Sequence, residues 1–142
     1  MIWIWIIGLV PIIWYVIKNH ELPVSISSLV YMMGNTLWTL WIWSLAGLIM
    51  PRLLDVLPEE WKFIGFIGLG CLGFVGAMPL IPDAPNTLHN VLGIATGIFT
   101  QVAVLILWPS LLWSWIIFLV LGWRKPVFVS EMICWVTLVS CL

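Results

Sequence analysis

Long apolar runs separated by short polar turns dominate the pattern of this chain. The runs are continuous, which favours helices over the strands of a membrane barrel, where apolar side chains alternate every second residue. A helix needs about 20 apolar residues to cross the hydrocarbon of a bilayer. The pattern therefore predicts an all-α, polytopic transmembrane bundle in a single domain, residues 1–142. The six expected helices are 1–17, 29–50, 63–81, 88–107, 111–123 and 127–142.

Prolines and charges mark the ends of these runs. A charged loop is expected over 51–61, a tight turn over 82–87, a break at Pro109, and a stop where Arg124 and Lys125 precede a proline. The last two segments are short for a full crossing. A bundle of five helices with a re-entrant segment at 111–123 is therefore the alternative.

The composition agrees with a membrane protein. Of 142 residues, 63% are hydrophobic and 8% are charged, whereas soluble domains carry about a quarter charged residues. The net charge of −1 lacks the basic footprint that nucleic acid requires. The expected partners are membrane lipids, together with other membrane subunits or further copies of the chain.

The basic residues give a weak signal for orientation. In a six-helix topology Lys18, Arg124 and Lys125 fall on one side, and Arg52 and Lys62 fall on the other. Cytoplasmic loops carry an excess of Lys and Arg. A bias of one residue favours both termini outside the cytoplasm.

Tryptophan is unusually frequent, with 12 residues. Trp61, Trp108 and Trp123 fall at segment ends, where the belt of interfacial aromatic side chains is expected. Trp38 and Trp41 fall near the middle of 29–50, where the belt does not explain them. They are expected either to pack helices together, with Trp3 or Trp5, or to line a groove for a lipid or a cofactor.

His89 opens a polar and small-residue stripe on segment 88–107. Steps of four residues from His89 reach Gly93, Gly97 and Gln101, and such steps share one helix face. One interpretation is helix packing, in which Gly93 and Gly97 admit a second backbone. The other is a polar cavity for a headgroup or a proton, with His89 at its mouth.

Glycines also recur on segment 63–81. Gly70, Gly73 and Gly76 are spaced three residues apart, which favours close packing against a neighbouring helix. The same packing is expected at Gly93 and Gly97. A hinge is the alternative for the glycines of 63–81.

Two carboxylates are further candidates. Asp83 lies in the turn before His89 and is interpreted as a turn residue, with Asn86 or Thr87 capping the next helix. The alternative pairs Asp83 with His89 for acid–base chemistry or metal binding. Glu131 lies inside 127–142 and is expected to reach the membrane interface or to pair with Arg124 or Lys125, with a proton relay as the alternative.

No cofactor is predicted. The alternative is a bound haem with His20 and His89 as its ligands. These two histidines fall on the same side of the membrane in a six-helix topology. Zinc has too few ligands, because the three cysteines, Cys71, Cys134 and Cys141, show no metal-site spacing and resemble small buried hydrophobes. The nucleophile motif G-x-S-x-G and the phosphate loop are both missing from the sequence.

Three short motifs carry a family resemblance. Residues 25–29 (SISSL) precede the second segment, 75–80 (VGAMPL) end the third, and 88–90 (LHN) open the fourth. This order resembles a bacterial six-helix membrane family of unknown function that is distantly similar to the DRAM-type autophagy modulators. The resemblance implies a six-helix bundle in a bacterial inner membrane, with Ser27, Pro79 and His89 near one membrane face.

These observations favour a non-enzymatic, multi-pass membrane protein, either a lipid-interacting module or a small subunit of a larger membrane assembly. One alternative is a small transporter, channel or membrane enzyme that uses a polar site around His89, Asp83 and Gln101. The other is a haem-binding electron-transfer subunit.

Overall fold

A computed structural model describes residues 2–142, and within them the chain is helical with no strand. The all-α prediction is therefore confirmed. The α-helices are α1 (Ile2–Asn19), α2 (Val30–Met33), α3 (Asn35–Val56), α4 (Lys62–Ala77), α5 (Thr87–Leu107), α6 (Ile116–Leu121) and α7 (Pro126–Ser140). The 3₁₀ turns are η1 (Ser27–Leu29), η2 (Glu59–Trp61) and η3 (Pro109–Trp115).

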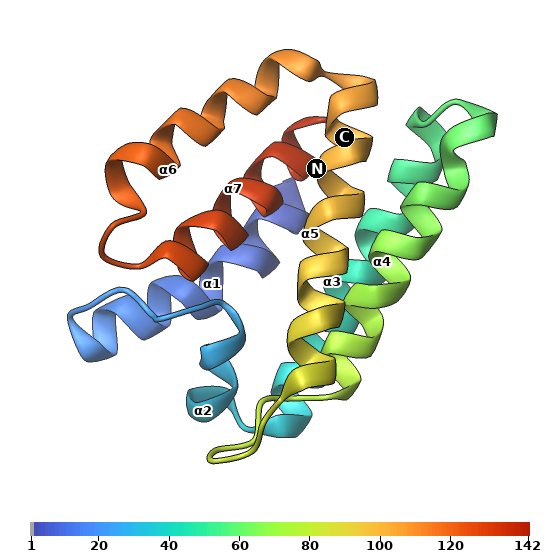
Figure 1. The fold of residues 1–142 in the computed structure, drawn as a ribbon. Coiled ribbons are helices and arrows are strands. Elements are labelled where there is room, and N and C mark those ends of the chain that lie inside the picture. Colours follow the sequence, from blue (N-terminus) through green and yellow to red (C-terminus); the bar gives the residue numbers. More distant parts are fainter. Residues whose placement is uncertain (1) are drawn as a thin grey trace.

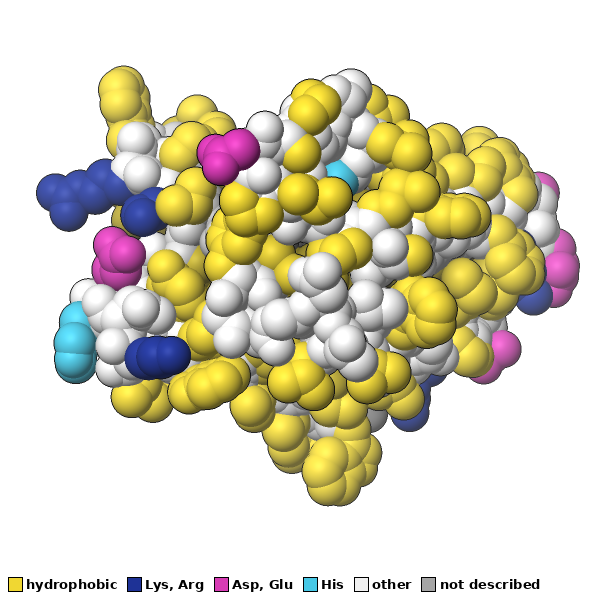
Figure 2. Space-filling view, turned by 90° about the horizontal axis from the view of Figure 1, so that it is seen from below, with side chains coloured by type: hydrophobic (Ala, Val, Ile, Leu, Met, Phe, Trp, Pro, Cys, Tyr) yellow, Lys and Arg dark blue, Asp and Glu magenta, His cyan; other side chains and the backbone are white. Residues whose placement is uncertain are grey.

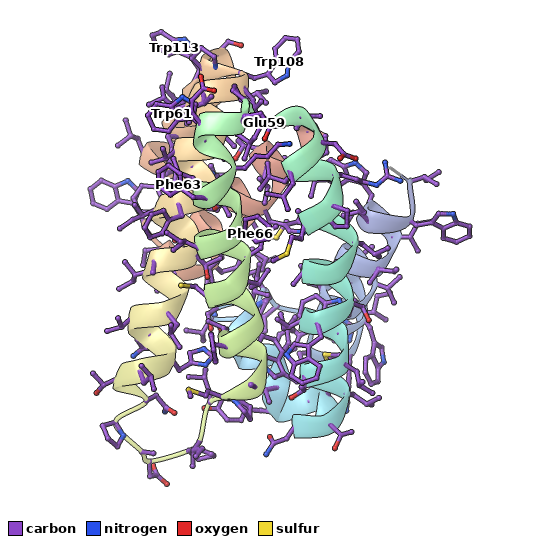
Figure 3. The ribbon with its side chains drawn as sticks, turned by 90° about the vertical axis from the view of Figure 1, so that its right-hand side faces the viewer. Glu59, Trp61, Phe63, Phe66, Trp108 and Trp113 are labelled. Carbon is purple, nitrogen blue, oxygen red and sulfur yellow. The ribbon has the colours of Figure 1, made fainter. Side chains whose placement is uncertain are left out.

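Two groups of helices make up the molecule. Helices α3, α4 and α5 stand side by side, each antiparallel to the next, and α4 packs extensively on both of its neighbours (Figures 1 and 3). Helices α1, α6 and α7 lie obliquely across the other side of α3 and α5 (Figure 1). The short α2 lies at the lower end, where it leads into α3.

Within residues 2–142, four helical segments are long and apolar enough to cross a membrane, which fits a membrane protein. They are Ile2–Asn19, Asn35–Val56, Glu59–Ala77 and Thr87–Leu107. The last two apolar segments, Pro109–Leu121 and Pro126–Ser140, are shorter. The first of these is also broken into η3 and α6, so the expected count of six full-length helices is not confirmed.

Three predicted boundaries are wrong. The segment expected at 29–50 is interrupted at Gly34, whose φ of 77° ends α2 before α3 begins. Helix α3 then continues through Pro51 to Val56, so that Arg52 and Asp55 lie in the last turns of a helix instead of a loop. Proline is tolerated inside transmembrane helices when its surroundings satisfy the freed carbonyl. Helix α4 ends at Ala77, four residues before the predicted end.

Polar side chains on α3 tie it to its neighbours. The Thr39 hydroxyl donates to the Gly76 carbonyl at 2.8 Å, and the Trp43 indole N–H donates to the Gly73 carbonyl at 2.9 Å. On the other side, the Trp41 indole N–H donates to the Ile7 carbonyl of α1 at 2.7 Å. Each bond holds two helices in register.

Close approach of helices explains some glycines and not others. A Cβ added to Gly76 would lie 2.8 Å from Ile42 of α3, and one added to Gly8 would lie 2.1 Å from the Trp135 ring of α7. The packing predicted at Gly76 is therefore present.

The other predicted packing glycines lie in looser surroundings. A Cβ at Gly70, Gly73 or Gly93 would meet no atom within 4 Å, so the prediction of close packing at these three positions is wrong. At Gly97 the added Cβ would make an ordinary contact, 3.7 Å from Cys134 Sγ.

The surface is largely apolar. Viewed from the lower end of the molecule, hydrophobic side chains cover most of the face and charged ones lie toward its sides (Figure 2). Trp61, Trp108 and Trp113 gather at the opposite end, beside the start of α4 and the end of α5 (Figure 3). Exposed tryptophans at one end of apolar helices are typical of a membrane interface.

Candidate functional site

A cavity of about 970 Å³ lies between the two groups of helices. Its wall is mainly apolar, and ligand cavities of roughly 300–1,000 Å³ with a few polar groups are typical of small-molecule sites. Of the residues singled out from the sequence, eight line it. They are Ser27, Trp38, Trp41, His89, Gly93, Gly97, Gln101 and Glu131.

The segment before α2 presents Ser27 to this cavity. Ser25 and Ser28 close a turn by reciprocal hydrogen bonds: the Ser28 N–H donates to Ser25 Oγ at 3.0 Å, and the Ser28 hydroxyl donates to the Ser25 carbonyl at 2.6 Å. Serine favours such side-chain-to-backbone bonds in turns. The turn therefore has a fixed shape, with the Ser27 side chain in the cavity wall.

His89 joins three parts of the chain. It lies in the first turn of α5 and is 5% exposed. Its Nδ1 is 2.6 Å from the Met78 carbonyl, which follows the end of α4, and its Nε2 is 3.0 Å from Ser27 Oγ. A carbonyl only accepts hydrogen bonds, so in the neutral imidazole Nδ1 carries the proton and Nε2 accepts from the Ser27 hydroxyl.

Glu131 reaches the same serine turn from α7. Its Oε2 accepts a hydrogen bond from the backbone N–H of Ile26. The expected pairing of Glu131 with Arg124 or Lys125 is wrong, because the described residues contain no such ion pair. Within residues 2–142, Oε1 makes no hydrogen bond, which leaves one carboxylate oxygen for a ligand.

Gln101 bonds to protein groups on both sides. Its amide N–H donates to Thr137 Oγ1 of α7 at 3.0 Å, and its carbonyl accepts from the Trp115 indole N–H at 2.9 Å. Gln101 therefore cross-links α5 with α7 and η3 in the cavity wall, and it lies farther along α5 than His89.

The tryptophans form part of the wall. The ring centroids of Trp38 and Trp41 lie 5.4 Å apart. Trp135 packs edge-on against Trp5, with 4.9 Å between their ring centroids. Trp41 thus joins α3 to α1 and also lines the cavity, whereas a lipid or cofactor beside it stays a prediction.

Two indole N–H groups in this wall, those of Trp38 and Trp135, are buried and have no acceptor among the described residues. A buried donor without a partner costs about 1–3 kcal/mol. An acceptor on a bound molecule that reached either group would recover part of that cost.

Asp83 lies apart from the site. It is exposed in the turn before α5, with a φ of 62°, and it does not line the cavity. The proposed pairing of Asp83 with His89 is wrong, because Met78 and Ser27 hold both ring nitrogens. The Asn86 side chain accepts a hydrogen bond from the Ile81 N–H and donates one to the Ile81 carbonyl. Asn86 therefore closes the turn, and its side chain does not cap α5.

The structure brings no obvious metal or haem ligands together. Among residues 2–142, no group of three or more His, Cys, Asp or Glu side chains could hold a metal. His20 is exposed just beyond α1, whereas His89 is buried and bonded through both nitrogens.

The cavity opens along α5. Ile94, Ile98 and Leu105 line it and are each more than half exposed, and Val127 of α7, which also lines it, is 50% exposed. In a bilayer these side chains would meet acyl chains. The opening is therefore apolar, while the serine turn and His89 supply the polar groups of the wall.

Sequence reasoning missed the partners that complete the polar cluster. Ser25 and Ser28 had a readable signal, since two serines three residues apart can bond reciprocally across a turn. The Met78 carbonyl and the Ile26 N–H are backbone groups whose positions depend on where α4 ends and where α7 packs. Sequence periodicity carries no information about either.

No family model, curated protein or solved structure matches this chain.

Proposed function

We propose that this chain is an integral membrane protein that binds a membrane lipid in the cavity between α3, α5 and α7. The polar headgroup lies beside Ser27, His89 and Glu131, and the acyl chain follows the apolar wall toward the opening along α5. The observation that carries the proposal is the cavity of about 970 Å³, apolar along most of its wall, with a few polar groups contributed by three separate segments.

The wall and the opening match the chemistry of a lipid. Ile94 and Ile98 on α5 are exposed at the cavity, so a lipid enters from the bilayer without leaving an apolar environment. The Ser27 hydroxyl donates its proton to His89, so its oxygen is left as an acceptor, and the free Oε1 of Glu131 is a second acceptor. A headgroup with hydroxyl or ammonium donors can bond to both oxygens.

The test is native mass spectrometry of the protein purified in mild detergent. We expect the wild-type particle to retain lipid. Gly93→Leu places a side chain in the cavity, where an added Cβ meets nothing within 4 Å, and it should lower the lipid-bound fraction several-fold.

Gly70→Leu is the matched control, because Gly70 also has open space around it but does not line the cavity. It should leave the lipid-bound fraction unchanged. A wild-type particle free of lipid would contradict the proposal, as would equal loss of lipid in both variants.

The bacterial inner membrane as location, and association with further membrane subunits or a second copy, stay predictions. In the same spectra, a mass equal to a multiple of the chain would support association.

A further inference from the structure

We propose that Ser27 and His89 form a catalytic pair that cleaves an ester of the bound lipid, with Ser27 as nucleophile and His89 as general base. The proposal rests on the lipid-binding function proposed above. It is carried by one juxtaposition: a serine hydroxyl in a cavity wall, 3.0 Å from a histidine whose other nitrogen is held by a carbonyl.

The hydrogen bonds of His89 run in the direction that a nucleophilic serine requires. Nucleophilic serines require a base within about 2.6–3.2 Å that a third group orients. Here the Met78 carbonyl fixes the proton on Nδ1 of His89, which leaves the Nε2 lone pair for the Ser27 hydroxyl. Met78 thus provides the orienting acceptor that a carboxylate provides in a Ser-His-Asp triad.

The Ser27 hydroxyl is accessible from the cavity. Ser27 is half-buried and His89 is buried, and both line the cavity. The Ser27 hydroxyl donates its proton toward His89, so its oxygen lone pairs are available to a carbonyl carbon in the cavity.

Further hydrogen bonds hold the serine turn in place. Reciprocal bonds between Ser25 and Ser28 fix the turn, and Glu131 holds the N–H of Ile26. Glu131 is thus a positioning residue. Among the described residues, the backbone N–H of Ser27 has no acceptor, so it is available to an oxyanion formed on the carbon bonded to Ser27 Oγ.

The reaction balances with water as the only co-reactant. Ser27 Oγ bonds to the ester carbonyl carbon and its proton moves to His89 Nε2. The ester C–O bond then breaks, the leaving alcohol takes that proton, and the acyl group stays on Ser27. Water attacks the acyl carbon while giving a proton to His89, and the carboxylic acid leaves as the proton returns to Ser27.

The experiment uses a fluorophosphonate probe, which forms a P–O bond to an activated serine with loss of fluoride. Purified full-length protein in mild detergent should be labelled, and the modified peptide should contain Ser27. Ser27→Ala should abolish labelling. His89→Gln, which keeps hydrogen-bonding capacity but lacks a base of equal strength, should slow labelling by at least about 100-fold.

Ser140→Ala is the matched control, because Ser140 is exposed at the end of α7 and does not line the cavity. It should label like the wild type. In phosphatidylcholine vesicles, the wild type should release free fatty acid. The rate of release should fall in His89→Gln and vanish in Ser27→Ala, as the rate of labelling does.

Native mass spectrometry on the same samples separates the two proposals. A wild type that retains lipid but is neither labelled nor releases fatty acid would overturn the catalytic pair and leave lipid binding intact. Labelling that persists in Ser27→Ala would also overturn it. A folded Ser27→Ala variant is recognised by its unchanged elution volume in size-exclusion chromatography.

Discussion

His89 shows how much a single side chain depends on groups that are distant in sequence. Its three-way contact joins the start of α5, the end of α4 and the turn before α2. The sequence placed His89 on a polar stripe with Gly93, Gly97 and Gln101, and all four line the cavity. The stripe was compatible with a packing face and with a cavity face, whereas the partners of His89 lie 11 and 62 residues away and could not be read from helical periodicity.

At Gly8 the space for a side chain is missing. An added Cβ would lie 2.1 Å from the Trp135 ring, and that ring is itself packed against Trp5. We expect Gly8→Ala to lower the free energy of unfolding by about 1–3 kcal/mol, the usual cost of overpacking. The measurement is unfolding by SDS titration in mixed micelles.

Gly70→Ala is the comparison for Gly8, because its added Cβ meets nothing within 4 Å. Alanine is favoured over glycine inside a helix by about 0.5–1 kcal/mol, so this variant should be slightly more stable than the wild type. Equal destabilisation by the two substitutions would contradict the packing described at Gly8.

At the scale of helices, the α3–α4 contact depends on hydroxyl and indole donors as well as on small residues. Thr39→Val keeps the shape of the side chain and removes its bond to the Gly76 carbonyl. Interhelical hydrogen bonds in membranes contribute about 0.6 kcal/mol on average, so a loss of that order is expected in the free energy of unfolding.

Ser44→Ala provides the control for Thr39. The Ser44 hydroxyl bonds the Leu40 carbonyl of its own helix and joins no other element. Its removal should change stability by less than Thr39→Val does in the same SDS titration. A larger effect at Ser44 would mean that the Thr39 bond does not stabilise the α3–α4 contact.

Helix positions were predictable from the sequence where apolar runs were long and their ends were marked. The segment predicted at 88–107 is α5, Thr87–Leu107, almost to the residue. The error at 29–50 has a local cause, because Gly34 takes a positive φ that no apolar count detects. The error at Pro51 arises because a proline marks a helix end in water but is accommodated inside α3.

At the scale of the whole molecule, the path of the helices predicts which turns share a membrane side. The connection after α1 and the turn between α6 and α7 lie on the left of the molecule, and the connection between α3 and α4 lies at the upper right (Figure 1). The exposed residues His20 and Arg124 belong to the first group, and Glu60 belongs to the second.

Cysteine labelling in sealed vesicles tests this topology. His20→Cys and Arg124→Cys should react with a membrane-impermeant maleimide from the same side, and Glu60→Cys should react from the opposite side. The unsubstituted protein, with its three partly or fully buried cysteines, gives the background. Labelling of Arg124→Cys and Glu60→Cys from one side would contradict the arrangement.

The shortness of the last two apolar segments has a consequence for the surrounding bilayer. Helix α7 has 15 residues, a length of about 22 Å at 1.5 Å per residue, against roughly 30 Å of hydrocarbon. A bilayer crossed by so short a helix is expected to thin beside it, at a cost of a fraction of a kcal/mol per Å of mismatch. Lipids with short acyl chains are therefore expected to concentrate around this flank, and the protein should resist thermal aggregation better in bilayers of 14-carbon than of 22-carbon phosphatidylcholine.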